Sequence, residues 1–240
     1  MAPRFRRRYF KKGKAMRTFG IICLSLIGSL SALAADKAVE RVQEAATVLE
    51  EVMGTPEQAI PSDLLLKAHC VAIVPGVKKV GFGIGGKYGK GVIACRGAGG
   101  KGWTGPSTIR IEGGSIGLQI GGSSTDYVLL MMNEKGKDKL LASKFTLGAD
   151  AAVAGGPVGR SAQAQTDAQM HAEILSYSRS RGAFAGVSLE GATLRQDEDD
   201  NKIIYGRAVT PKEILHGEIP PPDLAKGLLA TLNKYSSSEH

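Results

Sequence analysis

The sequence predicts an α+β fold, with a mainly antiparallel β core of barrel or sandwich type between N-terminal and C-terminal helices. Apolar residues recur at helical spacing close to both ends, over residues 36–53 and 223–235. The segments between them are short apolar or alternating runs bounded by glycine, proline and polar residues, which is typical of antiparallel strands. Many of the 32 glycines lie inside these runs, where glycine marks bulges, tight bends or close backbone approach.

Local end signals predict several shorter helices. Ser62 is suited to cap a short helix. Thr210 and Glu213 have the spacing of a capping box, with proline at the first helical position between them. The short helices are expected at residues 62–67, at residues 134–143 (as a helix or turn) and from residue 211 onward.

The strands are expected to be short and separated by tight turns. We expect them at residues 71–74, 80–86, 91–95, 109–112, 116–120, 127–132, 144–147, 172–178, 184–189 and 203–205. Lys87–Lys90 is predicted to be a hairpin turn, and Gly113-Gly114 a second turn. The acidic residues 197–201 indicate a solvated loop, and the tail from Ser236 is expected to be disordered.

The first 34 residues have the three parts of an export signal. A basic stretch runs to Arg17, an apolar core covers residues 19–30, and Ala32-Leu33-Ala34 is a small-residue pattern that a signal peptidase accepts. The apolar run of about 12 residues is too short to span a bilayer as a helix. We therefore expect an exported bacterial protein of the periplasm or cell envelope, with one mature domain at residues 35–240. An uncleaved anchor is the alternative.

The export route and the start of translation stay open. A twin-arginine-like pattern occurs at Arg7-Arg8, but it would be lost if translation began at Met16 rather than at Met1.

The positive charge of the chain belongs to this leader. The whole chain has 31 basic and 23 acidic residues, a net charge of +8. Eight of the basic residues and none of the acidic ones precede residue 18, so removing the leader leaves 23 basic residues against 23 acidic ones. A mature domain without net charge has no general electrostatic attraction for nucleic acid, and no nucleic-acid partner is expected.

Two cysteines, Cys70 and Cys95, remain after the leader is removed. In an oxidising compartment they can form a disulfide, which would stabilise the fold by about 3 kcal/mol. Two buried free thiols are equally compatible with the sequence. A twin-arginine route would favour free thiols, because folding would then precede export.

Three motif matches point to catalysis or nucleotide binding, but their context does not support them. Gly81–Gly86 fits G-x-G-x-x-G and nearly fits a P-loop, yet the residues that follow cannot start a stable helix, and Tyr88 stands where a P-loop needs a small hydroxyl. Ser115 lies in G-x-S-x-G, but a nucleophile elbow joins a strand to a helix and a strand is expected here. A hydrolase that uses Ser115 is kept as an alternative function.

The histidines give no evidence of a metal site. None of His69, His171, His216 and His240 has the spacing of a metal ligand set. No catalytic residue, metal or cofactor is therefore predicted.

Several short segments, taken together and in order, resemble the SYLF domain family. The resemblance extends over residues from about 40 to 216, which is nearly the whole mature chain. The matching segments are Ala72–Pro75, Gly81–Gly86, Lys144–Asp150, Gly155–Gly159, Ile174–Arg179 and Gly186–Gly191.

The resemblance implies a lipid-binding domain without catalytic activity. Eukaryotic members of the family bind phosphoinositides and some bind actin, whereas bacterial members are thought to work at the cell envelope. Actin is not expected as a partner of an exported protein. The expected partner is an anionic lipid or membrane surface, and the alternative is a structural envelope protein that binds another protein.

Four lysines and two aromatic residues form the candidate lipid-binding surface. They gather around the predicted hairpin: Lys78, Lys79, Lys87, Lys90, Phe82 and Tyr88. Each lysine close to an anionic surface can contribute about 1 kcal/mol. Ordinary solubilising lysines on a solvated turn explain the pattern equally well. The first helix is a second candidate, although its acidic polar face suits packing against the domain better.

Overall fold

A strongly curled β-sheet organises the chain from residue 38 onward. The structure, a computed structural model, describes residues 36–55, 59–117, 123–142, 144–159, 169, 171–180 and 183–236. The expected leader and most of the expected tail lie outside these residues. The chain divides into Met1–Lys37 and Ala38–His240, and the description below concerns the second unit.

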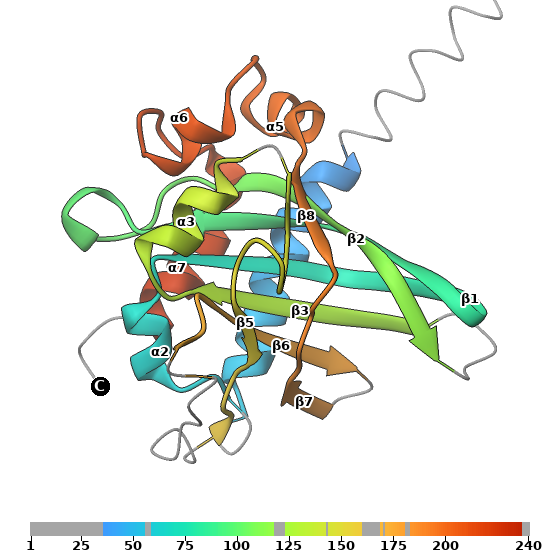
Figure 1. Cartoon of the computed structure of the whole chain (residues 1–240). Coiled ribbons are helices and arrows are strands. Elements are labelled where there is room, and N and C mark those ends of the chain that lie inside the picture. The colour runs from blue at the N-terminus through green and yellow to red at the C-terminus, as the bar shows by residue number, and fades with distance from the viewer. Residues whose placement is uncertain are drawn as a thin grey trace, which may run out of the picture. The chain divides into compact units, whose positions relative to one another are not determined.

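Within the described residues, eight strands form one sheet in the order β4-β8-β2-β1-β3-β6-β5, and β7 also pairs with β6. All neighbours run antiparallel except β5 and β6. This architecture confirms the predicted α+β class (Figure 1). The strands are β1 (Cys70–Cys95), β2 (Ser107–Gly117), β3 (Ser123–Met131), β4 (Lys144–Thr146), β5 (Val153–Gly155), β6 (Ile174–Ser180), β7 (Ala183–Gly186) and β8 (Thr193–Gln196).

The long strand β1 folds back on itself as a hairpin. Its first arm, residues 70–79, pairs with β3, and its second arm, residues 83–93, pairs with β2. The two arms lie close together: a β-carbon at Gly91 would lie 2.2 Å from the carbonyl oxygen of Ile73. Glycine at this position therefore permits an approach that no other residue would allow.

The glycine-rich hairpin was predicted correctly, but its turn was misplaced. Lys87–Lys90 continue the second arm and pair with Gly113–Arg110, so the chain reverses earlier, between Lys79 and Gly83. The predicted turn at Gly113-Gly114 is also wrong, because β2 continues through both glycines to Gly117. In each case glycines that suggest a turn instead allow close packing within the sheet.

Helices were mostly predicted correctly. The helix of residues 36–53 is present, and the capping box of Thr210 and Glu213 is formed. Ser62 is the first helical residue, not the N-cap, which is Pro61. The other described α-helices are α2 (Ser62–Lys67), α3 (Glu134–Leu140), α5 (Glu198–Tyr205), α6 (Pro211–Leu215) and α7 (Lys226–Tyr235), and the named 3₁₀ turns are η1 (Ala98–Gly100) and η3 (Asp223–Ala225).

The region that was predicted as an acidic loop and a strand is instead the helix α5. Three acidic residues, Glu198, Asp199 and Asp200, occupy its first turn, where negative charge is favourable at the positive end of the helix dipole. Gly206 ends it in the left-handed conformation with φ +67°. The residues expected as a strand, 203–205, form its last turn.

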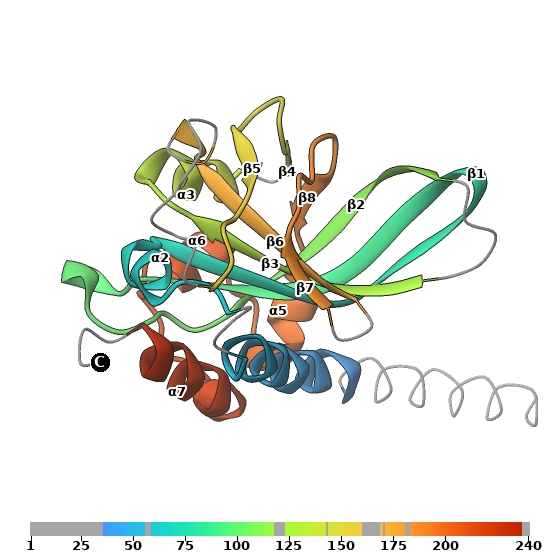
Figure 2. The same cartoon turned by 90° about the horizontal axis from the view of Figure 1, so that it is seen from below.

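Apolar side chains cover both faces of the curled sheet. On the outer face, Val71 and Ile73 of β1 pack in one cluster with Leu49 of the N-terminal helix and Leu232 of α7. Figure 2 shows these two helices side by side beneath the sheet. On the inner face a second cluster gathers alternate strand residues, among them Ile93.

The connection between β4 and β5 brings the two ends of the sheet together. β4 pairs with β8 at one end and β5 with β6 at the other, yet only a few residues join them. Leu147 and Ala151 form a bridge across this connection, and Gly148 turns with φ +84°. The sheet therefore curls into a half-barrel, with α3 and β5 on its inner side (Figure 2).

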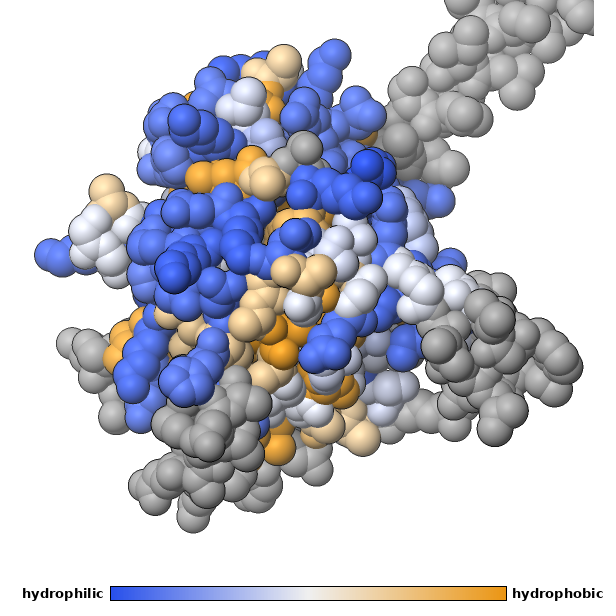
Figure 3. All heavy atoms as spheres, in the orientation of Figure 1, coloured by the Kyte–Doolittle hydropathy of each residue, from blue (hydrophilic) through white to orange (hydrophobic). Residues whose placement is uncertain are grey.

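The face that carries α3 is mixed in character. Figure 3 shows hydrophilic side chains over the helices and apolar atoms over β5 and the strands beside it. None of the helices that the structure describes is both long and apolar enough to cross a membrane.

Candidate functional site

The far end of the β1 hairpin carries the lysines that the sequence singled out. It projects beyond the helices, at the end of the sheet opposite to α2 (Figures 1 and 2). Val77 of the first arm lies against Gly89 of the second, since a β-carbon there would be 2.6 Å from its Cγ2 atom. The structure therefore brings Lys79 close to Lys87, although eight positions separate them in the sequence.

Lys79 and Lys87 lie on the inner face of the half-barrel. The ammonium of Lys79 is 5.8 Å from the ring centre of Tyr127, which belongs to the inner cluster. Burial lowers the pKa of Lys87, and the positive charge of Lys79 lowers it further. Neither ammonium forms an ion pair with another residue that the structure describes. Two cations thus share a surface, and no acidic side chain among the described residues pairs with either of them.

Successive side chains of a strand point to opposite faces, so Lys78 and Tyr88 lie on the outer face. Lys78 is exposed, and Tyr88 is 49 % exposed, one of two large apolar or aromatic side chains so exposed among the described residues. Phe82 belongs to β1, but its side chain lies outside what the structure describes. The end of the hairpin therefore presents cations on both faces and an aromatic ring on one.

Lys90 does not share this surface. Its ammonium lies 2.7 Å from Asp197 Oδ2 and 3.1 Å from Asp200 Oδ2. Burial lowers the pKa of Lys90, but the hydrogen bonds that its ammonium donates to the two carboxylates outweigh it and raise the pKa above its ordinary value. Arg41 of the N-terminal helix joins the same network, 2.5 Å from Asp200. Lys90 therefore ties β1 to two helices and is left out of the candidate surface.

The N-terminal helix is held against the sheet at both ends. Arg41 binds Asp200 near its start, and Glu51 binds Arg179 of β6 near its end. Arg179 also binds Asp126 of β3, at 2.8 Å. The apolar side of the N-terminal helix is buried in the outer cluster. The helix is therefore part of the packed domain, as its acidic polar face indicated.

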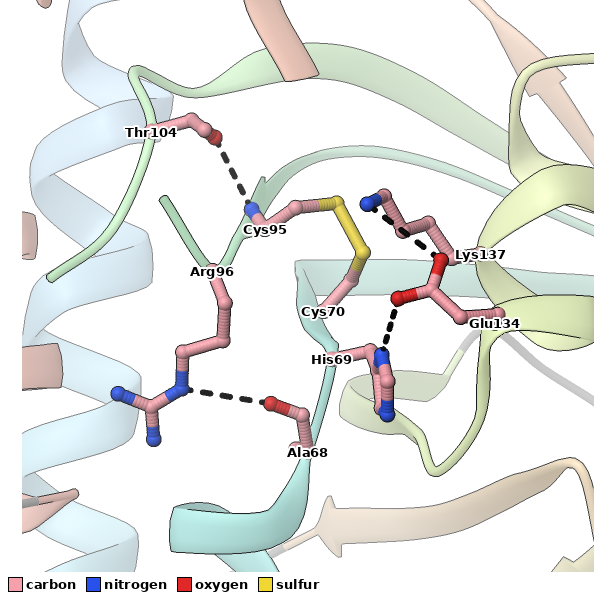
Figure 4. Close-up of a disulfide and its surroundings, with 8 residues drawn as sticks. All are labelled: Ala68, His69, Cys70, Cys95, Arg96, Thr104, Glu134 and Lys137. Atoms are coloured by element: carbon pink, nitrogen blue, oxygen red, sulfur yellow. Dashed lines mark hydrogen bonds and ion pairs between the residues drawn. A yellow bond between two sulfur atoms is a disulfide. The ribbon is translucent and has the colours of Figure 1, made fainter. Parts of the chain in front are cut away.

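The cysteines meet at the open ends of the hairpin arms. Cys70 and Cys95 are joined by a disulfide with a Cα–Cα distance of 3.9 Å, and both are fully buried. Figure 4 shows the disulfide, with His69 next to Cys70 just before the first arm and Arg96 next to Cys95 just after the second arm. The disulfide thus closes the hairpin at the end opposite to its lysines.

The backbone around the rejected motifs agrees with their rejection. Gly81–Gly86 is followed by the second strand arm and not by a helix. Ser115 lies within β2, paired with Gly85, whereas a nucleophile elbow requires a sharp turn into a helix. The described residues contain no group of three or more histidine, cysteine or carboxylate side chains placed to hold a metal.

Two features were missed by sequence reasoning. The first is the network around Asp200, which joins this residue to Arg41, 159 positions away in the sequence. The only local signal for the burial of Asp197 and Asp200 is that apolar residues follow them. A recess beside the disulfide is lined by residues from four separate segments. Its histidines and lysines have no common spacing in the sequence.

Comparison with known proteins gives one family match and several relatives. Residues 112–235 match the profile of the Ysc84 family, described as Las17-binding protein actin regulator. LAS seventeen-binding protein 3 of Saccharomyces cerevisiae is 37 % identical over 179 residues, which cover 73 % of this chain and 39 % of the relative.

Two further relatives carry SH3 domains by name. An SH3 domain-containing protein of Schizosaccharomyces pombe is 36 % identical over 181 residues, 74 % of this chain and 41 % of its own length. SH3 domain-containing YSC84-like protein 1 of Homo sapiens is 33 % identical over 182 residues, 75 % of this chain and 53 % of its own length. The matched part of this chain thus spans about half or less of the curated relatives.

Proposed function

Because this chain belongs to the Ysc84 family of SYLF domains, we propose that it is an exported protein without catalytic activity that binds anionic lipid surfaces of the cell envelope. The observation that carries the proposal is the group of lysines without described ion pairs at the projecting end of the β1 hairpin, Lys78, Lys79 and Lys87. We call these three residues the hairpin lysines.

Local charge is what the proposal requires. Since the residues after the leader have no net charge, attraction to a membrane has to come from a cluster. Each of the hairpin lysines contributes about 1 kcal/mol near an anionic surface. The contribution of Lys87 is expected to be larger, because a phosphate beside Lys79 and Lys87 would relieve the repulsion between the two ammonium groups, which lowers the pKa of Lys87.

Tyr88 suits the same role. Its ring is exposed on the face opposite to Lys87, and tyrosine is favoured at the boundary between lipid and water because one end is apolar and the other polar. A hairpin that meets a bilayer end-on would place the hairpin lysines at the headgroups and the ring of Tyr88 beside them. The rest of the domain would remain outside the bilayer.

Binding to vesicles tests this function. The protein is expected to co-sediment at low salt with vesicles of phosphatidylcholine and phosphatidylglycerol, and not with phosphatidylcholine alone. The double variant Lys79→Gln/Lys87→Gln should bind about thirtyfold more weakly, the equivalent of two lysines. The matched control is Lys202→Gln/Lys212→Gln, which removes two exposed lysines from α5 and α6.

Two results would overturn the proposal: no binding to anionic vesicles at low salt, or equal weakening by the control variant. Failure to bind vesicles together with capture of a defined envelope protein would favour a protein-binding scaffold instead. Ester turnover that is lost in Ser115→Ala would favour a hydrolase.

A further inference from the structure

A recess of about 690 Å³ lies beside the disulfide, at the end of the domain opposite to the hairpin lysines. Four segments form its walls: Leu66–His69 at the end of α2, Arg96 with the glycine turn η1, the start of α3, and the end of α6. Its volume is within the range of sites for small molecules.

Basic side chains dominate the described wall of this recess. Lys67, Arg96 and Lys137 line it together with His69 and His216, and Glu134 is the one acidic residue among its described lining residues. With both histidines neutral, these groups sum to two positive charges. An anion entering the recess would therefore meet a local field that the uncharged domain as a whole does not have.

Glu134 is already neutralised by its neighbours. His69 Nδ1 lies 2.8 Å from one carboxylate oxygen, and Lys137 Nζ lies 3.5 Å from the other (Figure 4). Burial by itself would raise the pKa of Glu134, but His69 and Lys137 outweigh it and lower the pKa. The carboxylate holds His69 and Lys137 at the recess and offsets the charge of Lys137.

Arg96 gives the recess a rigid wall. Its guanidinium is 4.2 Å from the ring centre of Trp103 and donates to the carbonyl oxygens of Leu65 and Ala68 at 3.1 and 3.4 Å. The backbone N–H of Arg96 also donates to His69, 2.8 Å away, next to the disulfide. Groups fixed in advance lose little conformational entropy when a ligand binds.

We propose that this recess binds a small, soluble oxyanion with more than one negative charge, of which phosphate is the simplest. Lys67 and Lys137 supply ammonium groups, the two histidines supply ring N–H donors, and Leu66 and Leu215 offer apolar contacts for an attached organic group. The position opposite to the hairpin lysines favours a dissolved anion over a lipid headgroup. The site is independent of the proposed membrane contact.

Titration with inorganic phosphate, followed by amide NMR at constant ionic strength, tests this site. Saturable shifts are expected at His69, Arg96 and Lys137 and at the turn η1. Lys67→Gln should weaken binding at least about tenfold, as loss of a charged hydrogen-bond donor does. Glu134→Gln should strengthen it, because the acidic side chain of the lining is removed. Lys135→Gln, on the exposed side of α3, is the matched control and should leave the affinity unchanged.

Shifts that do not saturate, equal weakening by Lys135→Gln, or weaker binding in Glu134→Gln would each overturn the proposal. Vesicle co-sedimentation separates it from the membrane function. Lys67→Gln should bind anionic vesicles normally, and Lys79→Gln/Lys87→Gln should bind phosphate normally. If Lys67→Gln loses vesicle binding while phosphate shifts are absent, the recess recognises a lipid headgroup and the proposal of a soluble ligand is wrong.

Discussion

The side chain of Lys87 passes over the backbone of Gly113, the residue paired with it on β2. A β-carbon at Gly113 would lie 3.0 Å from Lys87 Cε and 3.2 Å from Ala192 Cα. Because Gly113 has no side chain, the side chain of Lys87 can lie against the inner face, where burial lowers its pKa. A glycine that suggested a turn in the sequence instead shapes the surface around the candidate site.

Substitution of this glycine should therefore affect both stability and binding. Gly113→Ala is expected to cost about 1–3 kcal/mol of unfolding free energy, since the new methyl group crowds a backbone atom of Ala192 as well as the lysine. It should also weaken vesicle binding by displacing Lys87. Urea denaturation and co-sedimentation measure the two effects. Gly114→Ala, where nothing lies within 4 Å of the new β-carbon, should change neither; equal effects from the two variants would contradict this account.

The sequence predicted the hairpin better than the position of its turn. Lys87–Lys90 contain glycine and polar residues between apolar runs, which is the local pattern of a turn. Their place within a strand depends on pairing with β2, twenty or more residues further on, and local signals do not contain this pairing. The resemblance identified the fold family because it depends on several segments in order, and misplacement of one turn does not change that order.

The candidate site was predictable only in part. Lysines near one hairpin can be found by inspection, but the separation of Lys90 from the others depends on its partner Asp200, 110 positions away. The same distance explains why α5 was misread. The last turn of α5 contains Ile203 and Ile204, a short apolar run that resembles a strand. Only the contacts of Asp200 with Arg41 of the first helix and Lys90 of β1 show that the acidic residues before this run are buried.

A second glycine contact holds the β6 end of the sheet together. A β-carbon at Gly186 would lie 1.9 Å from the carbonyl oxygen of Gly156, an atom of the backbone that cannot move aside alone. Gly186→Ala should therefore destabilise the protein by about 3 kcal/mol, measured by urea denaturation. Gly227→Ala in the exposed start of α7 meets nothing within 4 Å and should instead add up to about 1 kcal/mol. A small loss in Gly186→Ala would show that the backbones at Gly186 and Gly156 do not approach this closely.

The network around Asp200 should contribute measurably to stability. Asp200→Asn leaves Arg41 and Lys90 with weakened partners in a partly buried site, and a loss of about 2 kcal/mol is expected. Asp199→Asn, at an exposed position next to it, should change stability by less than about 0.5 kcal/mol. Thermal and urea denaturation of the two variants provide the comparison.

The same network predicts a dependence on alkaline pH. The pKa of Lys90 is higher in the folded state than in the unfolded chain, where lysine titrates near about 10.4. Its stabilisation is therefore complete below the unfolded value and is lost as the pH rises through the folded value. As the pH rises above about 10.4, the wild type should therefore lose more stability than Lys90→Met. Parallel pH curves would contradict this assignment.

Export predicts a defined N-terminus. If the leader is cleaved after Ala34, protein recovered from the periplasm should begin at Ala35, and mass spectrometry should find none of the eight leader basic residues. Ala34→Leu removes the small residue that the peptidase needs and should leave an unprocessed form in the membrane fraction. Mature protein that retains residues 19–30 would indicate an anchor instead.

The disulfide should stabilise the hairpin and the recess together. Replacing both Cys70 and Cys95 by serine is expected to lower the unfolding free energy by about 3 kcal/mol, the effect of closing a loop of this length. A reductant should lower the urea midpoint of the wild type and leave that of the double variant unchanged. Because His69 and Arg96 adjoin the cysteines, the double variant should also bind phosphate more weakly while it still folds. Mass spectrometry that finds two free thiols in protein isolated from the periplasm would show that the bridge does not form there, and the twin-arginine route, with folding before export, would then be favoured.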